Sequence, residues 1–369
     1  MKSPTPILFV IDELIEGGGP RVCFNLIERL DRREFSPCVV TLFRCGRLGQ
    51  ALEKMEIPLL NLNVQAPFSL TSARRYLPVI SRFAVDNQVA LIHAHLTAAG
   101  LYASAIAFKL GVPSIFTAHG QLVKRLPFRW AEVLVRNLHS NVIGVSRGVE
   151  EEARRCIIWP GRRLQHIYNG VDTDYWKSDD RRDLPFPCTG EGITITMVAN
   201  FFKEKDHRSA IDAFAGFRDR FPHSRLLLVG EGELRQEVEH WVRDKAIDRV
   251  YFTGSSSDIF KLLEETDIFL LSTFTEGISI AVLEAMSMGL PVVASHVGSM
   301  AEIITHGENG LLVEEGKPEQ MEDALVRLCS DGALRRRLRQ NARERVEAAF
   351  SLQAMNDAYS RIYRELIER

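Results

Sequence analysis

The chain lacks the features of an exported, membrane-spanning or metal-clustered protein. Its six cysteines form no CxxC pair and show no metal-ligand spacing, which argues against a disulfide framework and favours a reduced, cytosolic compartment. The apolar run at residues 7–11 is too short for a secretory signal. The longest apolar stretch, about residues 97–108, falls short of the ~20 residues that cross a bilayer. We therefore expect a cytoplasmic protein without a membrane span.

A basic surplus is also absent. The formal net charge is −2, with 46 Lys or Arg against 48 Asp or Glu, and this balance gives no support for a nucleic-acid binder. With 46% hydrophobic and 25% charged residues, the composition is that of an ordinary globular protein. At 369 residues the chain exceeds the usual size of one hydrophobic core, so we expect two domains.

Short β-like runs alternate with helical patterns, which is typical of parallel sheets with helices on both faces. Seven runs precede a polar segment at residues 172–192, and six follow it. They lie at 7–12, 37–43, 58–64, 89–95, 113–118, 141–145 and 164–168, then at 193–198, 226–229, 250–252, 268–271, 291–294 and 311–313. We expect an α/β protein with two doubly wound domains, a polar linker, and an active site in the cleft between them at the carboxyl ends of the strands.

The most informative segment is residues 275–284. It follows an apolar strand; Gly277 permits a sharp turn, and Ser279 can cap the helix that begins there. Free amides at the start of such a helix bind phosphate, whereas carboxylates suit sugar and ribose hydroxyls. Glu276 in the turn and Glu284 in the helix could therefore hold the two ends of a sugar nucleotide. The alternative is that both are ordinary solvated or surface-paired acids.

Three other strand ends carry candidate ligand-binding groups. Lys205 lies in a polar loop before a helix, where its ammonium could neutralise a diphosphate; an exposed lysine is the alternative. Gly230 and Gly232 form a strand-to-helix turn without the third glycine of a dinucleotide fingerprint, which favours a simple turn near the cleft. Residues 16–20 contain three glycines and open a helix with Pro20 at its first position, which exposes amides or is merely a flexible turn.

Three histidines lie at predicted strand ends. The two-residue spacing of His93 and His95 places both on one face of a strand. No nearby carboxylate completes a set of metal ligands, so a hydrogen-bonded or cleft-lining role is favoured over a metal site. His119, which a glycine follows, is the better functional candidate.

Three further segments allow competing interpretations. Residues 144–148 match the nucleophile elbow of serine hydrolases, but Ser146 equally suits the N-cap of the next helix, which needs no triad. Residues 124–134 mix cations with aromatic and apolar side chains; they could rest on anionic lipid, although a core-facing helix with a basic rim is favoured. The cationic block at residues 335–339 predicts a solvated helix face.

Together and in this order, the motifs resemble the retaining glycosyltransferases of family 4, which have the GT-B fold of two facing Rossmann-like domains. The resemblance covers nearly the whole chain. It runs through residues 17–19, 92–95, 117–120, 144–146, 167–172, Lys205, residues 230–232, Glu276 and Glu284. The family's closing helix returns to the first domain, which implies domains at residues 1–175, joined by about 351–369, and at 190–350.

The resemblance also implies roles for single residues. In the family, the glutamate at the position of Glu276 and the amides after it hold the donor sugar and diphosphate, and the glutamate at the position of Glu284 bonds the ribose. By the same resemblance, Lys205 neutralises the leaving diphosphate. The implied catalytic residues are His119, Lys205 and Glu276. The implied donor-binding residues are Gly18, Gly19, Asn200, Lys205, Gly230, Gly277, Ile278, Ser279, Ile280 and Glu284. Many members carry arginine at the position of Asn200, so one diphosphate cation is missing here.

The implied reaction moves a sugar from a nucleotide-diphosphate sugar to an acceptor hydroxyl with retention, in the synthesis of cell-surface polysaccharide or lipid-linked glycan. No Asp-x-Asp pair stands where it could hold a divalent ion, so Lys205 and the amides of residues 277–280 must stabilise the leaving group, and we expect no metal and no cofactor. Expected partners are the donor, a glycan or lipid-linked acceptor and the inner membrane face, but no nucleic acid. A GT-B epimerase, a sugar-nucleotide binding module and a hydrolase using Ser146 are the alternatives, and UDP, GDP and ADP sugars stay open.

Overall fold

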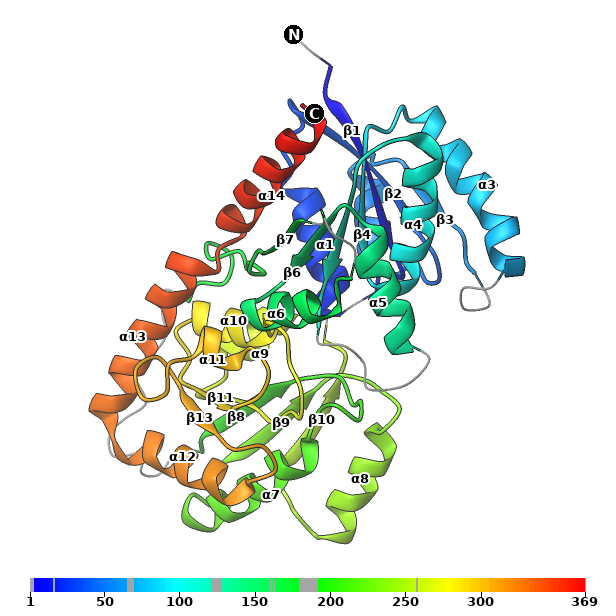
Figure 1. Ribbon diagram of the computed structural model, residues 1–369. Helices are drawn as coiled ribbons and strands as arrows, with labels where there is room; N and C mark the ends of the chain where they lie inside the picture. The colour runs from blue at the N-terminus through cyan, green and yellow to red at the C-terminus, as the bar shows by residue number, and fades with distance from the viewer. Residues whose placement is uncertain are drawn as a thin grey trace. The chain divides into compact units, whose positions relative to one another are not determined.

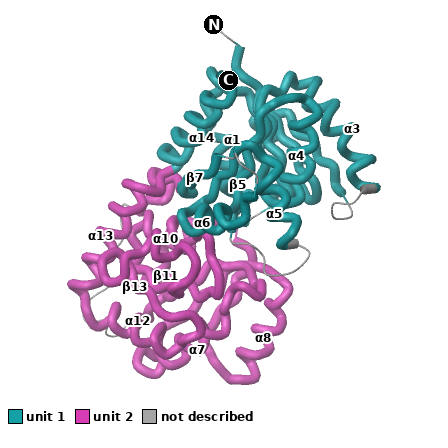
Figure 2. Tube along the Cα trace, in the orientation of Figure 1, with its two compact units in different colours: residues 1–170, 352–369 teal, residues 171–351 magenta. Residues whose placement is uncertain are grey.

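The chain forms two compact units, each built around one parallel sheet. The computed structural model describes residues 3–15, 17–64, 70–120, 128–158, 161, 163–178, 192–256 and 258–368. The first unit comprises residues 1–170 together with 352–369, and the second comprises residues 171–351 (Figure 2).

The first unit contains a seven-stranded sheet in the order β3-β2-β1-β4-β5-β6-β7, with every pair parallel. Its strands are β1 (Thr5–Ile11), β2 (Phe35–Thr41), β3 (Leu59–Asn61), β4 (Leu91–His95), β5 (Ser114–Ala118), β6 (Asn141–Gly144) and β7 (Arg163–His166). The central strands are buried along nearly their whole length, which explains why they read in the sequence as continuous apolar runs.

Seven helices of the described residues cover this sheet in two layers (Figure 1). They are α1 (Gly18–Glu28), α2 (Arg47–Lys54), α3 (Leu70–Asp86), α4 (Thr97–Leu110), α5 (Phe128–Leu138), α6 (Arg147–Cys156) and α14 (Leu352–Ile367). Helices α3, α4, α5 and α6 contact one another in sequence, whereas α1 contacts α2 and α14. The chain builds the sheet in one direction from β1 to β3 and in the other direction from β4 onward. Because the crossover connections between parallel strands are right-handed, this reversal places the two groups of helices on opposite faces of the sheet.

The second unit contains a six-stranded parallel sheet in the order β10-β9-β8-β11-β12-β13. Its strands are β8 (Thr194–Val198), β9 (Arg225–Val229), β10 (Val250–Gly254), β11 (Ile268–Leu271), β12 (Val292–Ser295) and β13 (Leu311–Val313). Its helices are α7 (His207–Arg220), α8 (Arg235–Asp244), α9 (Ile259–Glu264), α10 (Ile280–Ser287), α11 (Met300–Ile303), α12 (Pro318–Ser330) and α13 (Gly332–Ala349).

The closing helix α14 is part of the first unit. It contacts α1 and β4, and its buried Tyr359 and Tyr363 reach polar groups of the sheet. Tyr363 Oη lies 2.7 Å from His93 Nδ1, and Tyr359 Oη lies 3.1 Å from Thr117 Oγ1. The expected pattern of two doubly wound parallel sheets is confirmed, with each of the thirteen predicted strands present within a few residues.

Two local expectations are wrong. Helix α1 begins at Gly18, so Pro20 is its third residue rather than its first. The cationic block at residues 335–339 is solvated at Arg336 and Arg337, but Arg335 is buried, and its guanidinium donates to the Leu328 carbonyl oxygen at 2.8 Å. The last carbonyls of α12 need donors from outside that helix, and Arg335 in the adjoining helix supplies one.

No helix in the described part of the chain is long and apolar enough to cross a membrane.

Candidate functional site

Each sheet has a point where the strand order reverses, and in doubly wound sheets ligands bind beside that point at the carboxyl ends of the strands. In the second unit it lies between β8 and β11. The two loops that leave these strands are joined by backbone hydrogen bonds. The Asp206 N–H donates to the Ser272 carbonyl at 3.1 Å, and the Phe274 N–H donates to the Glu204 carbonyl at 2.9 Å. The sheet topology therefore holds residues 204–206 against residues 272–274.

This arrangement brings Lys205 and Glu276 together. The Lys205 ammonium forms an ion pair with the Glu276 carboxylate, and the two side chains are only 22% and 16% exposed. The Glu276 backbone is fixed as well, because its carbonyl accepts a hydrogen bond from the Ser299 N–H at 3.2 Å. A β-carbon on the adjacent Gly298 would lie 2.0 Å from that oxygen, so only glycine fits.

Helix α10 follows Glu276 and begins with free amides. Ser279 is its N-cap, and the Ser279 hydroxyl accepts a hydrogen bond from the Val282 N–H at 3.5 Å. The first turn carries no acidic side chain, and the N–H groups of Ile280 and Ala281 meet no acceptor among the residues that the structure describes. Glu284, half-buried, lies on the next turn. A cation, a carboxylate and a helix N-terminus thus converge, which suits a diphosphate linked to a hydroxylated group.

The turn after β9 packs tightly on the loop after β8. A β-carbon on Gly230 would lie 2.2 Å from the Ala199 carbonyl oxygen and 3.1 Å from the Asn200 Cα. One on Gly232 would lie 2.5 Å from the Phe201 carbonyl oxygen. These glycines are required for backbone approach, and the contact brings Gly230 beside Asn200. Gly277 and Ile278 are buried directly before the helix that Ile280 opens.

In the first unit, the glycine segment and His119 are neighbours. A β-carbon on Gly19 would lie 3.5 Å from His119 Cγ, whereas one on Gly18 would meet nothing within 4 Å. Gly17 is the N-cap residue of α1. The N-terminus of α1 therefore lies beside an imidazole, at the strand-order reversal between β1 and β4.

The three histidines lie in contact with one another; His93 and His95 are fully buried and His119 is half-buried. His95 Nδ1 lies 2.9 Å from His119 Nε2, and His93 and His95 have ring centroids 4.2 Å apart. Burial lowers the pKa of His119 to about 4 and the pKa values of His93 and His95 well below the usual value, so all three are neutral near pH 7. His93 is fully hydrogen-bonded, because Nε2 lies 2.8 Å from Thr117 Oγ1 and Nδ1 contacts Tyr363.

Two residues near His95 are not predicted from the sequence. Leu96 has φ of 72° and ψ of 164°, a region that only glycine adopts readily. Leu96 is also the N-cap residue of α4, and its apolar side chain cannot accept a hydrogen bond from the helix. Asp12 supplies the missing acceptor, because the Ala99 N–H in the first turn of α4 donates to Asp12 Oδ1 at 2.6 Å. Burial raises the pKa of Asp12 to about 7. An aspartate at the end of β1 is a visible signal, but the strained Leu96 has none.

Ser146 acts as a helix cap. It is fully buried, and its hydroxyl accepts a hydrogen bond from the Val149 N–H at 3.1 Å in α6. Residues 124–127 of the basic aromatic stretch lie outside the described residues, and the remainder begins α5. Within the described ranges, no group of three His, Cys, Asp or Glu side chains is placed to hold a metal ion.

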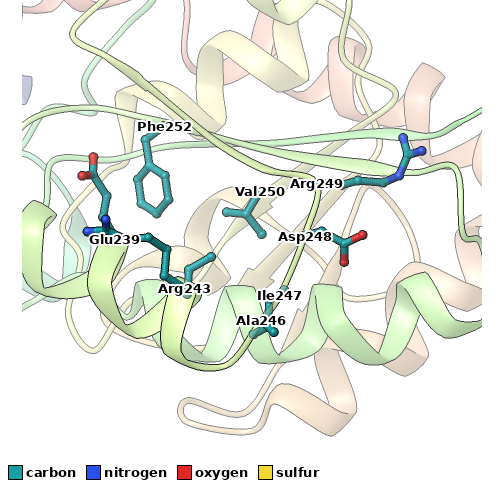
Figure 3. Close-up of a pocket in the computed structure, with 9 residues that line it drawn as sticks. Glu239, Arg243, Ala246, Ile247, Asp248, Arg249, Val250 and Phe252 are labelled. Carbon is teal, nitrogen blue, oxygen red and sulfur yellow. The ribbon is translucent and has the colours of Figure 1, made fainter.

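A cavity of about 620 Å³ lies elsewhere in the second unit (Figure 3). Arg243 and Ala246 line it at the end of α8, and Arg249, Val250 and Phe252 line it at β10. Val250 begins its strand, so this cavity lies toward the amino end of the sheet, away from the loops that carry Lys205 and Glu276.

Known proteins share both the sequence and the fold. The family model described as Glycosyltransferase Family 4 matches residues 16–175, and that of Glycosyl transferases group 1 matches residues 183–345. N-acetyl-alpha-D-glucosaminyl L-malate synthase of Bacillus anthracis is 29% identical over 229 residues, which are 61% of this chain and 60% of that protein. The chain thus matches only about three fifths of that relative's length.

A second relative and a solved structure extend the match. The UDP-Gal:alpha-D-GlcNAc-diphosphoundecaprenol alpha-1,3-galactosyltransferase of Escherichia coli is 24% identical over 75% of this chain and 76% of its own. Anabaena HepE, solved in complex with UDP and glucose, superposes with a TM-score of 0.84 at 22% identity, over 98% of this chain and 99% of its own. The chain belongs to the family 4 glycosyltransferases and has their GT-B fold.

Proposed function

We propose that this chain transfers a sugar from a nucleotide-diphosphate sugar to an acceptor hydroxyl, with retention at the anomeric carbon. The observation that carries the proposal is the meeting of Lys205 and Glu276 beside the open amides of α10. Family membership supports it, as do relatives named as glycosyltransferases and a neighbour that binds UDP with glucose. Lys205, Glu276 and His119 are the proposed catalytic residues.

The proposed donor site uses the same groups. Lys205 and the amides of residues 277–280 face the diphosphate, and their positive charge stabilises the leaving group as the glycosidic bond breaks. Glu276 and Glu284 accept hydrogen bonds from sugar and ribose hydroxyls. In the first unit, the residues proposed to act are neutral His119 in catalysis and Gly18 and Gly19, at the start of α1, in donor binding. No metal is needed in this scheme.

The Lys205–Glu276 ion pair has a direct consequence for donor binding. The ammonium already has a counterion, so an entering diphosphate must compete with the Glu276 carboxylate for it. When the diphosphate takes the Lys205 ammonium, the Glu276 carboxylate loses its ion-pair partner. A sugar hydroxyl that donates a hydrogen bond to Glu276 replaces that interaction. The pair therefore favours a complete sugar nucleotide over a bare nucleotide diphosphate.

We place the enzyme in the cytoplasm, acting on a glycan or lipid-linked acceptor for polysaccharide or lipid-linked glycan synthesis, with peripheral contact to the inner membrane face. The name of the E. coli relative, whose acceptor carries a diphosphoundecaprenol, supports the lipid-linked class. The even charge balance argues against nucleic acid as a partner.

A thermal-shift panel of UDP, GDP and ADP sugars tests the donor class. A ligand at 100 times its dissociation constant stabilises the folded state by about 2.7 kcal/mol, so the true donor should raise the unfolding midpoint clearly. The sugar nucleotide identified is then incubated with candidate acceptors, and the anomeric configuration of the product is read by NMR. Transfer with inversion, or an absence of any nucleotide-sugar binding, would contradict the proposal.

The same assays separate the alternatives. An epimerase forms a new sugar nucleotide without acceptor, and a binding module stabilises on binding but never releases the nucleotide. A hydrolase is labelled by a fluorophosphonate at Ser146, which its burial argues against. The names of the B. anthracis and E. coli relatives give no support to any of the three.

A further inference from the structure

Exposed apolar side chains gather on one helical layer of the first unit. Of the twelve large apolar side chains exposed in the described part of the chain, seven lie on α3, α4 and α5 or just after α6. They are Val79, Val85, Phe108, Trp130, Leu134, Leu138 and Ile158. These helices contact one another in sequence, and α3, α4 and α5 lie side by side in Figure 1. We call this surface the α3–α5 face.

Helix α5 shows that this exposure follows a pattern. Trp130, Leu134 and Leu138 are spaced by four residues, so they form one stripe along the helix, and Trp130 is 67% exposed. Val135, on another side of the helix, is fully buried. The helix therefore has an apolar face turned to the core and a second apolar face turned outward. Phe108 on the neighbouring α4 is 92% exposed.

The same face is positively charged. Helices α3, α4 and α5 carry six Lys or Arg and two Asp or Glu, a surplus of four in a chain whose net charge is −2. Arg136 is buried, and the other five cations, namely Arg74, Arg75, Arg82, Lys109 and Arg129, are exposed. Of the two acids, Asp86 is exposed and lies 3.7 Å from Arg82, while Glu132 is half-buried.

We propose that the α3–α5 face rests on a bilayer that contains anionic phospholipid. An exposed tryptophan and aliphatic side chains suit the boundary between headgroups and acyl chains, and the cations attract anionic headgroups. A protein partner of opposite character would need an acidic apolar surface, whereas a membrane supplies both features over any area. The proposal rests on the membrane contact in the proposed function and deepens it, because it extends the contact from the stretch at residues 124–134 to a whole helical layer.

Vesicle flotation with the full chain tests this directly. Phosphatidylcholine vesicles are compared with vesicles containing about one third phosphatidylglycerol, at about 0.15 and 0.5 M salt. The protein should float with the anionic vesicles and not with the neutral ones, and high salt should weaken binding. The variant Trp130→Ser with Leu134→Ser should weaken vesicle binding by about tenfold or more, since it removes two apolar anchors.

Matched variants keep the result interpretable. Met55→Ser with Tyr251→Ser removes two exposed apolar side chains outside this face, and should bind vesicles like the parent chain. Lys109→Glu with Arg129→Glu should abolish the preference for anionic lipid, whereas Arg220→Glu with Arg327→Glu in the second unit should not. Unchanged unfolding midpoints show that each variant folds.

Several results would overturn the proposal. One is equal flotation with neutral and anionic vesicles; another is equal loss in the Met55 and Tyr251 control. A self-associated parent chain that becomes monomeric in the Trp130 and Leu134 variant would instead make this face a protein interface. Because vesicle binding is measured without any sugar nucleotide, the membrane proposal can fail while the proposed transfer reaction stands, and the reverse.

Discussion

At the residue scale, Lys205 should control turnover through its charge. Lys205→Ala removes the side-chain cation proposed to face the leaving diphosphate, and loss of one such stabiliser lowers turnover by about 10²-fold or more. Lys203 in the same loop is exposed, so Lys203→Ala is a matched control that should keep near-parental turnover. Steady-state transfer rates decide the point. Equal rates for the two variants would remove Lys205 from the site.

Gly298 should be irreplaceable for a steric reason. Gly298→Ala adds a β-carbon 2.0 Å from the Glu276 carbonyl oxygen, in a residue whose φ is +52°. Gly307 has φ of +77° but open space around its β-carbon position, so Gly307→Ala carries only the backbone strain. In denaturant titrations, Gly298→Ala should be less stable than Gly307→Ala by about 1–3 kcal/mol, the usual range for overpacking. Similar stabilities would show that the segment around Glu276 yields easily.

Single residues differ in how far the sequence reveals their importance. Glu276, Ser279 and Lys205 lie beside recognisable strand-end and helix-start patterns, so the sequence alone identifies them as candidate site residues. The sequence does not identify Gly298 or Leu96. The importance of Gly298 depends on its contact with the Glu276 backbone, and that of Leu96 depends on its backbone angles. Whether the nominated residues bind the donor stays a prediction.

At the scale of elements, the N-terminus of α10 offers a test that separates stability from function. Ser279→Ala removes the N-cap and should cost about 1 kcal/mol of stability. Asp258→Ala removes the N-cap of α9 and should cost about as much. We expect reduced transfer only in Ser279→Ala, since only that cap orients amides proposed to face the diphosphate. Comparable transfer rates at comparable stability would separate the α10 amides from the chemistry.

The strands are predictable because those in parallel sheets are buried on both faces and must be apolar throughout. Their order is not, and it is the order that brings residues 204–206 against 272–274. Helix surfaces are harder to predict, because a charged sequence does not reveal what packs against it. Arg335 is an example: its guanidinium donates a hydrogen bond to a carbonyl at the end of α12, which the local charge pattern does not predict.

At the scale of the whole chain, buried titrating groups should make stability depend on pH. Burial lowers the pKa of His119 and His207 to about 4, and lowers those of His93 and His95 well below the usual value. Between pH 6.5 and 4 the unfolded chain therefore binds protons that the folded chain does not. Stability from these groups is complete above about pH 6.5 and is lost as the pH falls, by up to about 1.4 kcal/mol per pH unit for each fully buried group.

Asp12 changes the pH dependence of stability in the opposite direction from the histidines, so its substitution tests the sign of the effect. Its pKa is raised to about 7 in the folded chain, so between pH 3.8 and 7 it favours folding more as the pH falls. One carboxyl cannot offset four imidazoles, and the unfolding midpoint should drop from pH 7 to pH 5. Asp12→Asn should steepen that drop, whereas His207→Gln should flatten it. Midpoints measured at both pH values test the signs: if Asp12→Asn leaves the drop unchanged instead, Asp12 is ionised in the folded chain at pH 5–7 and its burial does not govern its charge.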